Sequence, residues 1–134
     1  MRRDLRLVGV AVVTLTTLLL GGCSSSSTAG AKVDPVAFLT EVSSPEVIVL
    51  DVRTPEEFAA GHLAGARNID VEGAGFAAQV ATLDPTATYA VYCRSGRRSA
   101  VAAATLTELG FTHVIDLDGG LVDLEAAGAA VVTS

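Results

Sequence analysis

Apolar residues in this chain occur in short unbroken runs that are separated by longer stretches of mixed character. Residues 47–50 and 89–92 are apolar at every position, and residues 114–117 are apolar apart from one aspartate. Such a run is typical of a parallel strand that is buried on both faces of a sheet. Residues 66–69 form a shorter candidate strand. Strands that alternate with helices predict an α/β domain built on a parallel sheet.

Helix signals occupy the stretches between these runs. Asp34 followed by Pro35 predicts a helix through residue 42, with Asp34 as the N-cap and Pro35 in the first turn. Thr54-Pro55-Glu56-Glu57 is a capping box, which predicts a short helix that ends near Gly61. Further helices are expected at residues 76–83, from about 97 to 109 with Gly110 as C-cap, and at 121–127 before Gly128.

Residues 1–22 carry the pattern of an export signal. Arg2, Arg3 and Arg6 form a basic start, and residues 7–20 are apolar without a single charge. The following Gly21-Gly22-Cys23 resembles the end of a bacterial lipoprotein signal, in which the cysteine is lipidated after cleavage. This resemblance implies a lipid anchor at Cys23 that holds the protein on the outer face of the bacterial cell membrane.

Two alternatives remain open for this leader: an uncleaved transmembrane helix, and a signal whose cleavage releases a soluble domain. The apolar run is shorter than the ~20 residues that a spanning helix needs. All three interpretations place the domain outside the cytoplasm. Residues 23–32 are rich in serine and are expected to tether the lipidated cysteine to one domain at residues 33–134.

The distribution of charge narrows the choice of binding partner. A formal net charge of −6 argues against nucleic acid as a partner. Three of the nine basic residues lie in the leader, and three of the other six fall within residues 94–98. An acidic protein with one local basic patch is suited to binding a small anion.

The candidate chemistry lies in residues 93–99, where an apolar run ends in a cysteine and a basic turn precedes a helix. A helix start leaves backbone N–H groups without partners and carries partial positive charge, so a loop over it can hold an anion. Cys93 opens this loop beside Arg94, Arg97 and Arg98. The helix start and the guanidinium groups both favour the thiolate, which predicts a nucleophile with a lowered pKa. Gly96 suits a loop that turns its N–H groups inward.

Cysteine content supports a chemical role for Cys93. If Cys23 carries a lipid, Cys93 is the only remaining thiol and no intramolecular disulfide can form. The alternative is an inert thiol buried at a strand end. Three arginines within the next five residues would be costly neighbours of a buried thiol unless they face solvent or an anion. For each of the three arginines the alternative is a surface charge that only contacts solvent. Arg97 is the strongest candidate for this alternative.

Four polar residues outside the loop are candidates for structural support. Asp51 and Arg53 follow a predicted strand and are interpreted as a buried pair that holds the strand end, with Arg67 as a candidate partner. His62 has a possible acid or base role, but no second catalytic partner is identifiable near it. It is therefore interpreted as part of a structural turn.

The loop Cys93-Arg94-Ser95-Gly96-Arg97-Arg98-Ser99 resembles the active-site loop of the rhodanese-like sulfurtransferase family, in which a cysteine, a glycine and an arginine form a cradle. Residues 50–58, 61–69 and 118–120 resemble the other signatures of that family, in its order, so that the resemblance spans about residues 33–132. It implies a single rhodanese-like domain with a central parallel β-sheet of about five strands and helices on both faces.

The resemblance also implies a reaction. The Cys93 thiolate would take a sulfane sulfur from a small anionic donor of the thiosulfate kind, hold it as a persulfide, and pass it to a thiol or cyanide-like acceptor. No cofactor is implied, and two histidines with one free cysteine do not make a metal site. The implied substrate-binding residues, which supply backbone N–H groups, guanidinium groups and hydroxyl donors, are Arg94, Ser95, Gly96, Arg97, Arg98 and Ser99.

Two other functions fit parts of the same pattern. Phosphatases and arsenate reductases also use a cysteine and an arginine, typically with five residues between them, whereas Cys93 and Arg98 have four residues between them. A persulfide carrier or partner-binding module would use the same residues as an enzyme and stays open. One departure from the family is Leu124, where an aromatic residue is common, and it predicts a less aromatic pocket wall.

Overall fold

The computed structural model describes residues 30–134. The expected signal, the lipidation site Cys23 and most of the expected tether fall on residues 1–29, outside the described residues. No helix within residues 30–134 has the length and apolar character needed to cross a membrane. The strands are β1 (Ala31–Val33), β2 (Val47–Asp51), β3 (His62–Leu63), β4 (Arg67–Asn68), β5 (Thr88–Tyr92), β6 (His113–Leu117) and β7 (Val131–Val132). The helices are α1 (Pro35–Val42), α2 (Pro55–Ala60), α3 (Phe76–Val80), α4 (Arg97–Glu108) and α5 (Leu121–Ala126).

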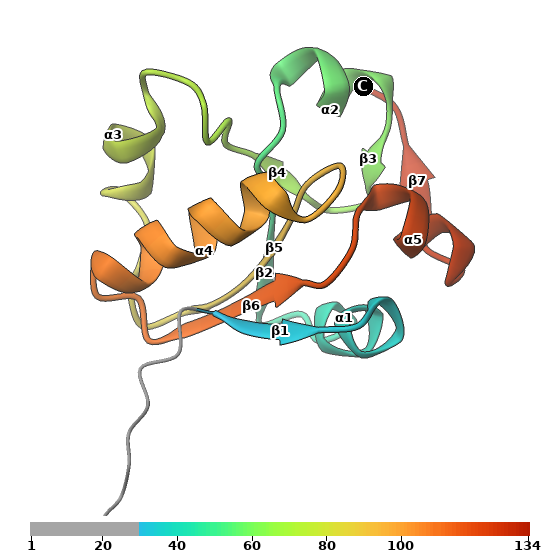
Figure 1. Ribbon diagram of the computed structural model, residues 1–134, viewed down its shortest axis with the longest axis horizontal. Helices are drawn as coiled ribbons and strands as arrows, with labels where there is room; N and C mark the ends of the chain where they lie inside the picture. Colours follow the sequence, from blue (N-terminus) through green and yellow to red (C-terminus); the bar gives the residue numbers. More distant parts are fainter. Residues whose placement is uncertain (1–29) are drawn as a thin grey trace, which may run out of the picture.

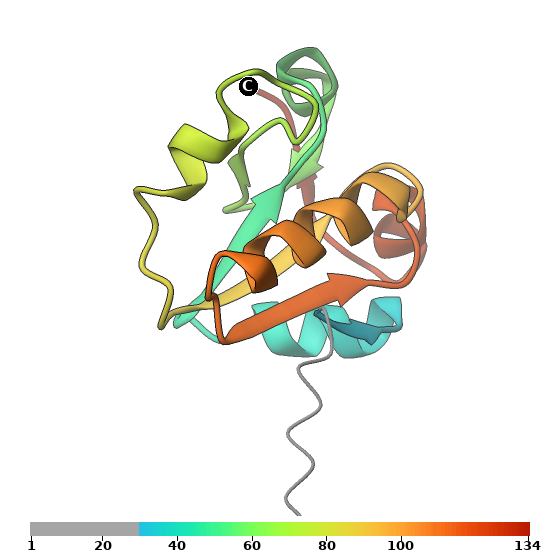
Figure 2. The same ribbon diagram turned by 60° about the vertical axis from the view of Figure 1, so that its left-hand side comes forward.

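Five parallel strands form the central sheet in the order β1-β6-β5-β2-β4. Helices cover both of its faces, with α4 lying across one face and α1 against the other (Figures 1 and 2). Apolar side chains of α3 and α4 pack into one core cluster, and those of α1 and α5 pack into a second. The predicted α/β architecture with a five-stranded parallel sheet is therefore confirmed.

Burial of the central strand β5 on both faces explains why its sequence is apolar at consecutive positions. Tyr89 and Val91 point into the cluster beneath α4, whereas Ala90 and Tyr92 point into the cluster beneath α1 and α5. All four side chains are almost completely buried. A strand that is covered on both faces has no position at which a polar side chain can reach water, so the alternation of a half-exposed strand is absent.

Two helix starts follow the predicted capping chemistry. The Asp34 carboxylate accepts hydrogen bonds from the backbone N–H groups of Val36 and Ala37 at 2.9 Å each, and Pro35 opens α1. At α2, Thr54 and Glu57 form the reciprocal capping box. These bonds satisfy N–H groups that a helix start leaves without partners, and they fix the chain where it leaves β1 and β2.

The start of the domain corrects one expectation. Ala31 and Lys32, assigned to the tether, pair with Ile115 and Asp116 of β6 as part of the edge strand β1. The Lys32 ammonium also lies 3.3 Å from the buried carboxylate of Asp116. A three-residue edge strand contains too few side chains for a recognisable hydrophobic pattern, and its position depends on the ladder that β6 offers. The ordered domain therefore includes residues 31 and 32.

A second, two-stranded sheet was also absent from the predicted elements. β3 and β7 pair in antiparallel fashion, with His62 opposite Val132 and Leu63 opposite Val131. This pairing brings the end of the chain beside α2 (Figure 1), and the Ser134 N–H donates to the carbonyl oxygen of Ala59. The short sheet thus closes the region around the turn that follows α2.

Candidate active site

The residue Cys93 lies where β5 ends and the loop to α4 begins. Gly96 is the N-cap of α4 and has a φ of 93°, a left-handed conformation that residues with a Cβ rarely adopt. The predicted need for glycine at this position is therefore met. In parallel sheets the region beyond the carboxyl ends of the strands is the usual place for a binding site. Asp51, the last residue of β2, lies opposite Tyr92 at the same edge of the sheet as Cys93.

The sulfur of Cys93 is enclosed by the loop. The side chain is fully buried, and the Gly96 backbone N–H donates a hydrogen bond to Sγ at 3.0 Å. Burial raises the pKa of the Cys93 thiol, but the backbone N–H groups of Ser99, Ser95 and Gly96 outweigh it and hold this pKa below its usual value. The loop therefore stabilises a negative charge on sulfur.

This lowered pKa predicts the pH dependence of the thiol. The folded chain should form the Cys93 thiolate with a midpoint below the ordinary thiol value of about 8.5. The difference in ultraviolet thiolate absorbance between the native chain and Cys93→Ser, followed against pH, measures that midpoint and removes the signal of Cys23. The same shift stabilises the folded state above the ordinary thiol pKa, and this contribution is lost as the pH falls through the lowered value. A midpoint at or above 8.5 would contradict the role given to the loop N–H groups.

The double glycine after β6 supports the loop by close backbone contact. A Cβ on Gly120 would clash with the carbonyl oxygen of Arg94 and lie 2.9 Å from the backbone nitrogen of Ser95. The Leu121 N–H donates to the carbonyl oxygen of Cys93 at 3.1 Å. The start of α5 is thus built directly against the first residues of the loop, and only glycine permits this approach.

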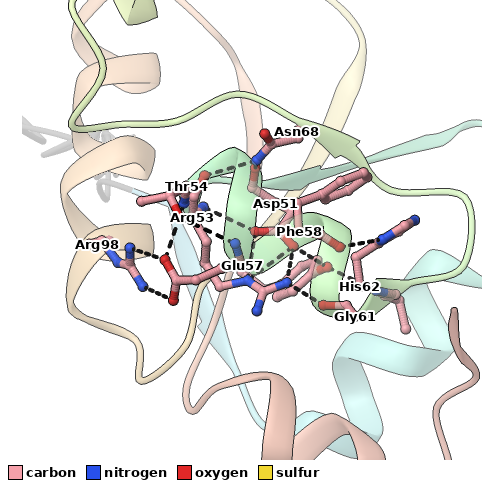
Figure 3. A network of polar contacts seen from close by, with 11 residues as sticks. Asp51, Arg53, Thr54, Glu57, Phe58, Gly61, His62, Asn68 and Arg98 are labelled. Atoms are coloured by element: carbon pink, nitrogen blue, oxygen red, sulfur yellow. Dashed lines mark hydrogen bonds and ion pairs between the residues drawn. The ribbon is translucent and has the colours of Figure 1, made fainter. Parts of the chain in front are cut away.

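The arginines of the loop have different surroundings. The Arg98 guanidinium forms a two-pronged ion pair with the Glu57 carboxylate, with N–O distances of 2.7 and 2.8 Å (Figure 3), and lies 3.7 Å from a carboxylate oxygen of Glu72. The side chains of Arg94 and Arg97 are exposed. The role expected for Arg98, steering an anionic donor, stays a prediction, and these carboxylates offset much of its charge. Arg94 and Arg97 remain as exposed cations.

The contact with Glu57 was missed by sequence reasoning, which assigned this residue to the capping box alone. Its carboxylate both receives the Thr54 N–H at 3.2 Å and pairs with Arg98, so it links α2 to the first turn of α4. The hydrogen bonds from Arg98 lower the pKa of Glu57 to about 2. The carboxylate of Glu57 was visible in the sequence as part of the capping box. Its ion-pair partner Arg98 was not predicted, because it lies 41 residues away along the chain.

The two serines of the loop also differ. Ser95 is exposed at the loop tip, where its hydroxyl is free to approach a bound molecule. Ser99 is fully buried, and its hydroxyl donates to the carbonyl oxygen of Gly96 at 3.2 Å. Ser99 therefore holds the shape of the loop, and both its backbone N–H and its hydroxyl help to lower the pKa of the Cys93 thiol, which agrees with the expected hydroxyl donor.

A buried polar network supports the loop from beneath. Asp51 and Arg53 form the expected ion pair, with 2.6 Å between Nη2 and Oδ2, and Arg53 also donates to the carbonyl oxygen of Gly61 (Figure 3). The hydroxyl of Tyr92 donates to the same Asp51 carboxylate at 2.6 Å and receives the Leu63 N–H at 2.9 Å. Because Tyr92 directly precedes Cys93, the network fixes the strand end that carries the thiol.

Arg67 does not take part in this network. Its side chain is exposed at the start of β4, and among residues 30–134 the ion-pair partner of Asp51 is Arg53. The neighbouring Asn68 does contribute, because its amide donates to the carbonyl oxygens of Asp51 and Arg53. The candidate partnership of Arg67 with Asp51 is therefore corrected.

His62 makes the contacts of a structural residue. Its Nδ1 lies 2.8 Å from the carbonyl oxygen of Phe58, and its ring stacks on the Phe58 ring with 3.6 Å between centroids. Both contacts fasten the turn after α2, and His62 lies close to the described end of the chain through β7. This arrangement agrees with the interpretation of His62 as part of a turn.

Two pockets flank the ion pair between Glu57 and Arg98. One of about 330 Å³ is lined in part by Glu57, Arg94 and Leu121, and one of about 280 Å³ is lined in part by Arg98. Leu124 lines neither of these pockets, because it is fully buried in the core cluster beneath α5. Leu124 therefore does not form the wall itself, and the first turn of α5 supplies apolar side chains instead. The lining of these two pockets contains no aromatic side chain, which agrees with the predicted less aromatic wall.

Known sulfurtransferases share part of this sequence. The chain is 40% identical over 75 residues to the thiosulfate sulfurtransferase PspE of Escherichia coli K12, across 56% of this chain and 71% of PspE. It is 43% identical over 74 residues to the thiosulfate sulfurtransferase GlpE of Pseudomonas putida, across 54% of this chain and 64% of GlpE. The match to GlpE thus spans less than two thirds of that relative.

Solved structures share the fold over most of the described chain. A rhodanese-related protein of Thermoplasma volcanium superimposes with a TM-score of 0.68 at 29% identity, covering 78% of this chain and 99% of that one. The Alr3790 protein of Anabaena superimposes with a TM-score of 0.68 at 25% identity, covering 76% and 82% of the two chains. The family model of the rhodanese-like domain matches residues 34–127. The chain therefore belongs to the rhodanese-like domain family.

Proposed function

We propose that this chain is a sulfurtransferase that carries a sulfane sulfur on Cys93, from a small anionic donor of the thiosulfate kind to a nucleophilic acceptor. The observation that carries the proposal is the enclosed sulfur of Cys93, which receives the Gly96 N–H at 3.0 Å and has a lowered pKa. The thiolate is the nucleophilic form of cysteine, and a lowered pKa increases its fraction at a given pH below the ordinary thiol value. The names of PspE and GlpE support the same reaction class.

The reaction balances without a cofactor. The Cys93 thiolate attacks the outer sulfur of thiosulfate, a bond forms between the two sulfurs, and the bond to the sulfonate sulfur breaks so that sulfite leaves with the electron pair. The resulting persulfide is an anion, and the inward N–H groups of the loop stabilise its charge. With Arg98 bound to Glu57, the exposed guanidinium groups of Arg94 and Arg97 are the loop cations that would attract the donor.

Phosphoryl or arsenate chemistry is less well supported by this loop. Those reactions need an arginine whose two N–H groups face the oxygens of a tetrahedral anion. At the helix end of this loop, Arg98 already donates from both terminal guanidinium nitrogens to the carboxylate of Glu57. These N–H groups are therefore not free to face a tetrahedral anion. The sulfurtransferase proposal requires backbone N–H groups alone at the reacting sulfur.

Intact mass spectrometry tests the proposal. The purified chain is incubated with thiosulfate, with Cys93→Ser as the control, and then with cyanide. The native chain should gain the mass of one sulfur atom and lose it to cyanide as thiocyanate forms, whereas the variant should gain nothing. Repeated turnover distinguishes an enzyme from a carrier that releases one sulfur per encounter. Failure of the reduced native chain to take sulfur from thiosulfate or polysulfide would overturn the proposal.

Replacing Glu57 with glutamine should improve binding of a dianionic donor. Glutamine can still complete the capping box with Thr54, while the Arg98 guanidinium loses its neutralising charge and becomes available to the donor. The KM for thiosulfate is expected to fall about two- to fivefold, which is the range for one partly exposed ion pair. Glu56→Gln is the matched control, because Glu56 is exposed on the same helix. A KM that rises in Glu57→Gln but not in Glu56→Gln would show that the ion pair shapes the site.

We also propose that the chain is exported and lipid-anchored through Cys23. The proposal is supported by the basic start, the uncharged apolar run and the Gly21-Gly22-Cys23 sequence at its end. Metabolic labelling with a radioactive fatty acid should mark the native chain in its bacterial host and leave Cys23→Ala unlabelled. Equal labelling of both chains, or labelling of neither, would contradict the anchor.

A further inference from the structure

The larger pocket beside the loop contains charges that the supporting network does not use. Its lining brings together Arg94 of the loop and Glu125 of α5, two exposed side chains from different elements. Within residues 30–134 neither of them takes part in an ion pair. One cation and one anion therefore face the same pocket, and both are available to a ligand.

The other charged groups of this pocket are already engaged. Arg53 is bound to Asp51 and to the carbonyl oxygen of Gly61, and Glu57 is bound to Arg98. Arg53 and Glu57 therefore line the pocket with charges that their ion-pair partners already offset. The charge selectivity of the pocket thus depends on Arg94 and Glu125.

Apolar side chains lie between these charges. Leu121 and Val122 come from the first turn of α5, and Val131 comes from β7. Val122 is 69% exposed, so its side chain is accessible to a ligand in this pocket. The volume of about 330 Å³ lies at the small end of the range for ligand pockets.

Building on the proposed sulfurtransferase function, we propose that this pocket binds the sulfur acceptor, and that the acceptor is a small zwitterionic thiol of the amino-acid type. Its carboxylate would pair with the Arg94 guanidinium, its ammonium with the Glu125 carboxylate, and its methylene groups would lie on Val122. Arg94 lines the pocket and directly follows Cys93 in the loop, so the pocket adjoins the loop that carries the persulfide.

The charges favour the acceptor over the donor as the occupant. Thiosulfate carries two negative charges, no cation and no apolar part, so Glu125 would repel it and Val122 would add nothing. An amino-acid thiol matches all three features of the pocket. Its thiolate attacks the outer sulfur of the Cys93 persulfide, a new sulfur–sulfur bond forms, and the bond to Sγ breaks to return the Cys93 thiolate. The acceptor leaves as a persulfide, and no oxidant or reductant is consumed.

Single-turnover discharge of the preloaded persulfide tests the proposal. The purified full chain is loaded with labelled thiosulfate, freed of donor and mixed with cysteine, mercaptopropionate, cysteamine or mercaptoethanol. These probes carry both charges, the carboxylate alone, the ammonium alone and neither charge. Each discharge rate is divided by the mercaptoethanol rate of the same protein, which cancels any change in the persulfide itself. Comparing native and variant chains for one probe cancels the intrinsic reactivity of that thiol.

The variants Glu125→Gln and Arg94→Gln separate the two charges, and Glu108→Gln, an exposed residue at the far end of α4, is the matched control. Glu125→Gln should slow the relative rates for cysteine and cysteamine about fivefold and spare mercaptopropionate. Arg94→Gln should slow cysteine and mercaptopropionate about fivefold and spare cysteamine. Glu108→Gln should match the native chain for every probe.

The outcomes separate this proposal from the function on which it rests. A chain that loads sulfur and discharges it to cyanide, but whose relative rates are unchanged in both variants, would overturn the acceptor pocket and leave the sulfurtransferase intact. A chain that never loads sulfur overturns both. Equal slowing of all four thiols in Glu125→Gln would assign the residue to loop structure and also overturn the charge-matching role.

Discussion

Replacing Gly120 with alanine is expected to disrupt the Cys93 loop and to slow sulfur loading about 100-fold, the loss that a displacement of about 1 Å at a reacting centre can cause. The added Cβ would clash with the Arg94 carbonyl oxygen and lie 2.9 Å from the Ser95 nitrogen. Both are backbone atoms, so no side-chain rotation can relieve the clash. Gly120 has a φ of −140°, which any residue adopts, so the effect is steric.

The same substitution should lower the free energy of unfolding by about 3 kcal/mol, at the upper end of the range for overpacking. Urea denaturation measures that loss, and intact mass spectrometry with thiosulfate measures the loading rate. Gly75→Ala is the matched control, because its φ of −88° is ordinary and its Cβ would meet only the end of the flexible Gln79 side chain. Native-like loading by Gly120→Ala would show that the loop tolerates displacement of α5.

Local chemistry made much of the fold predictable. The apolar runs of β2 and β5, the N-cap Asp34 and the capping box at α2 each act within a few residues. Their consequences depend on burial and on helix-end hydrogen bonding, which sequence spacing expresses directly. The position of Cys93 after a central strand and before a long helix followed from the same reasoning.

Long-range pairing set the limits of prediction. The partner of Arg98 is Glu57, 41 residues earlier, and several nearby carboxylates would have been equally plausible partners from the sequence. The short strands β1, β3 and β7 contain two or three residues each, so they carry no recognisable pattern and depend on neighbouring strands. The burial of Leu124 in the core beneath α5 was not predictable, because distance along the chain from the double glycine says nothing about which face of α5 is buried.

Replacing Arg53 with methionine should cost about 3–5 kcal/mol of the free energy of unfolding, which is the penalty for leaving a buried charge without its partner. Asp51 is completely buried and receives hydrogen bonds from Arg53 and from the Tyr92 hydroxyl. Methionine fills a similar volume but offers no positive charge. The Asp51 carboxylate then keeps its neutral donors and loses the group that compensates its desolvation.

Urea denaturation of two comparison variants identifies the cause of that loss. Arg67→Met removes an exposed arginine from β4 and should change the unfolding free energy by less than about 0.5 kcal/mol. Asp51→Asn combined with Arg53→Met removes both charges and should recover part of the stability lost in Arg53→Met alone, because no unpaired buried charge remains. A double variant as unstable as the sum of its two single variants would show that packing, and not charge, accounts for the effect. Because the network anchors Tyr92 directly before Cys93, the single variant should also load sulfur more slowly under conditions in which it is still folded.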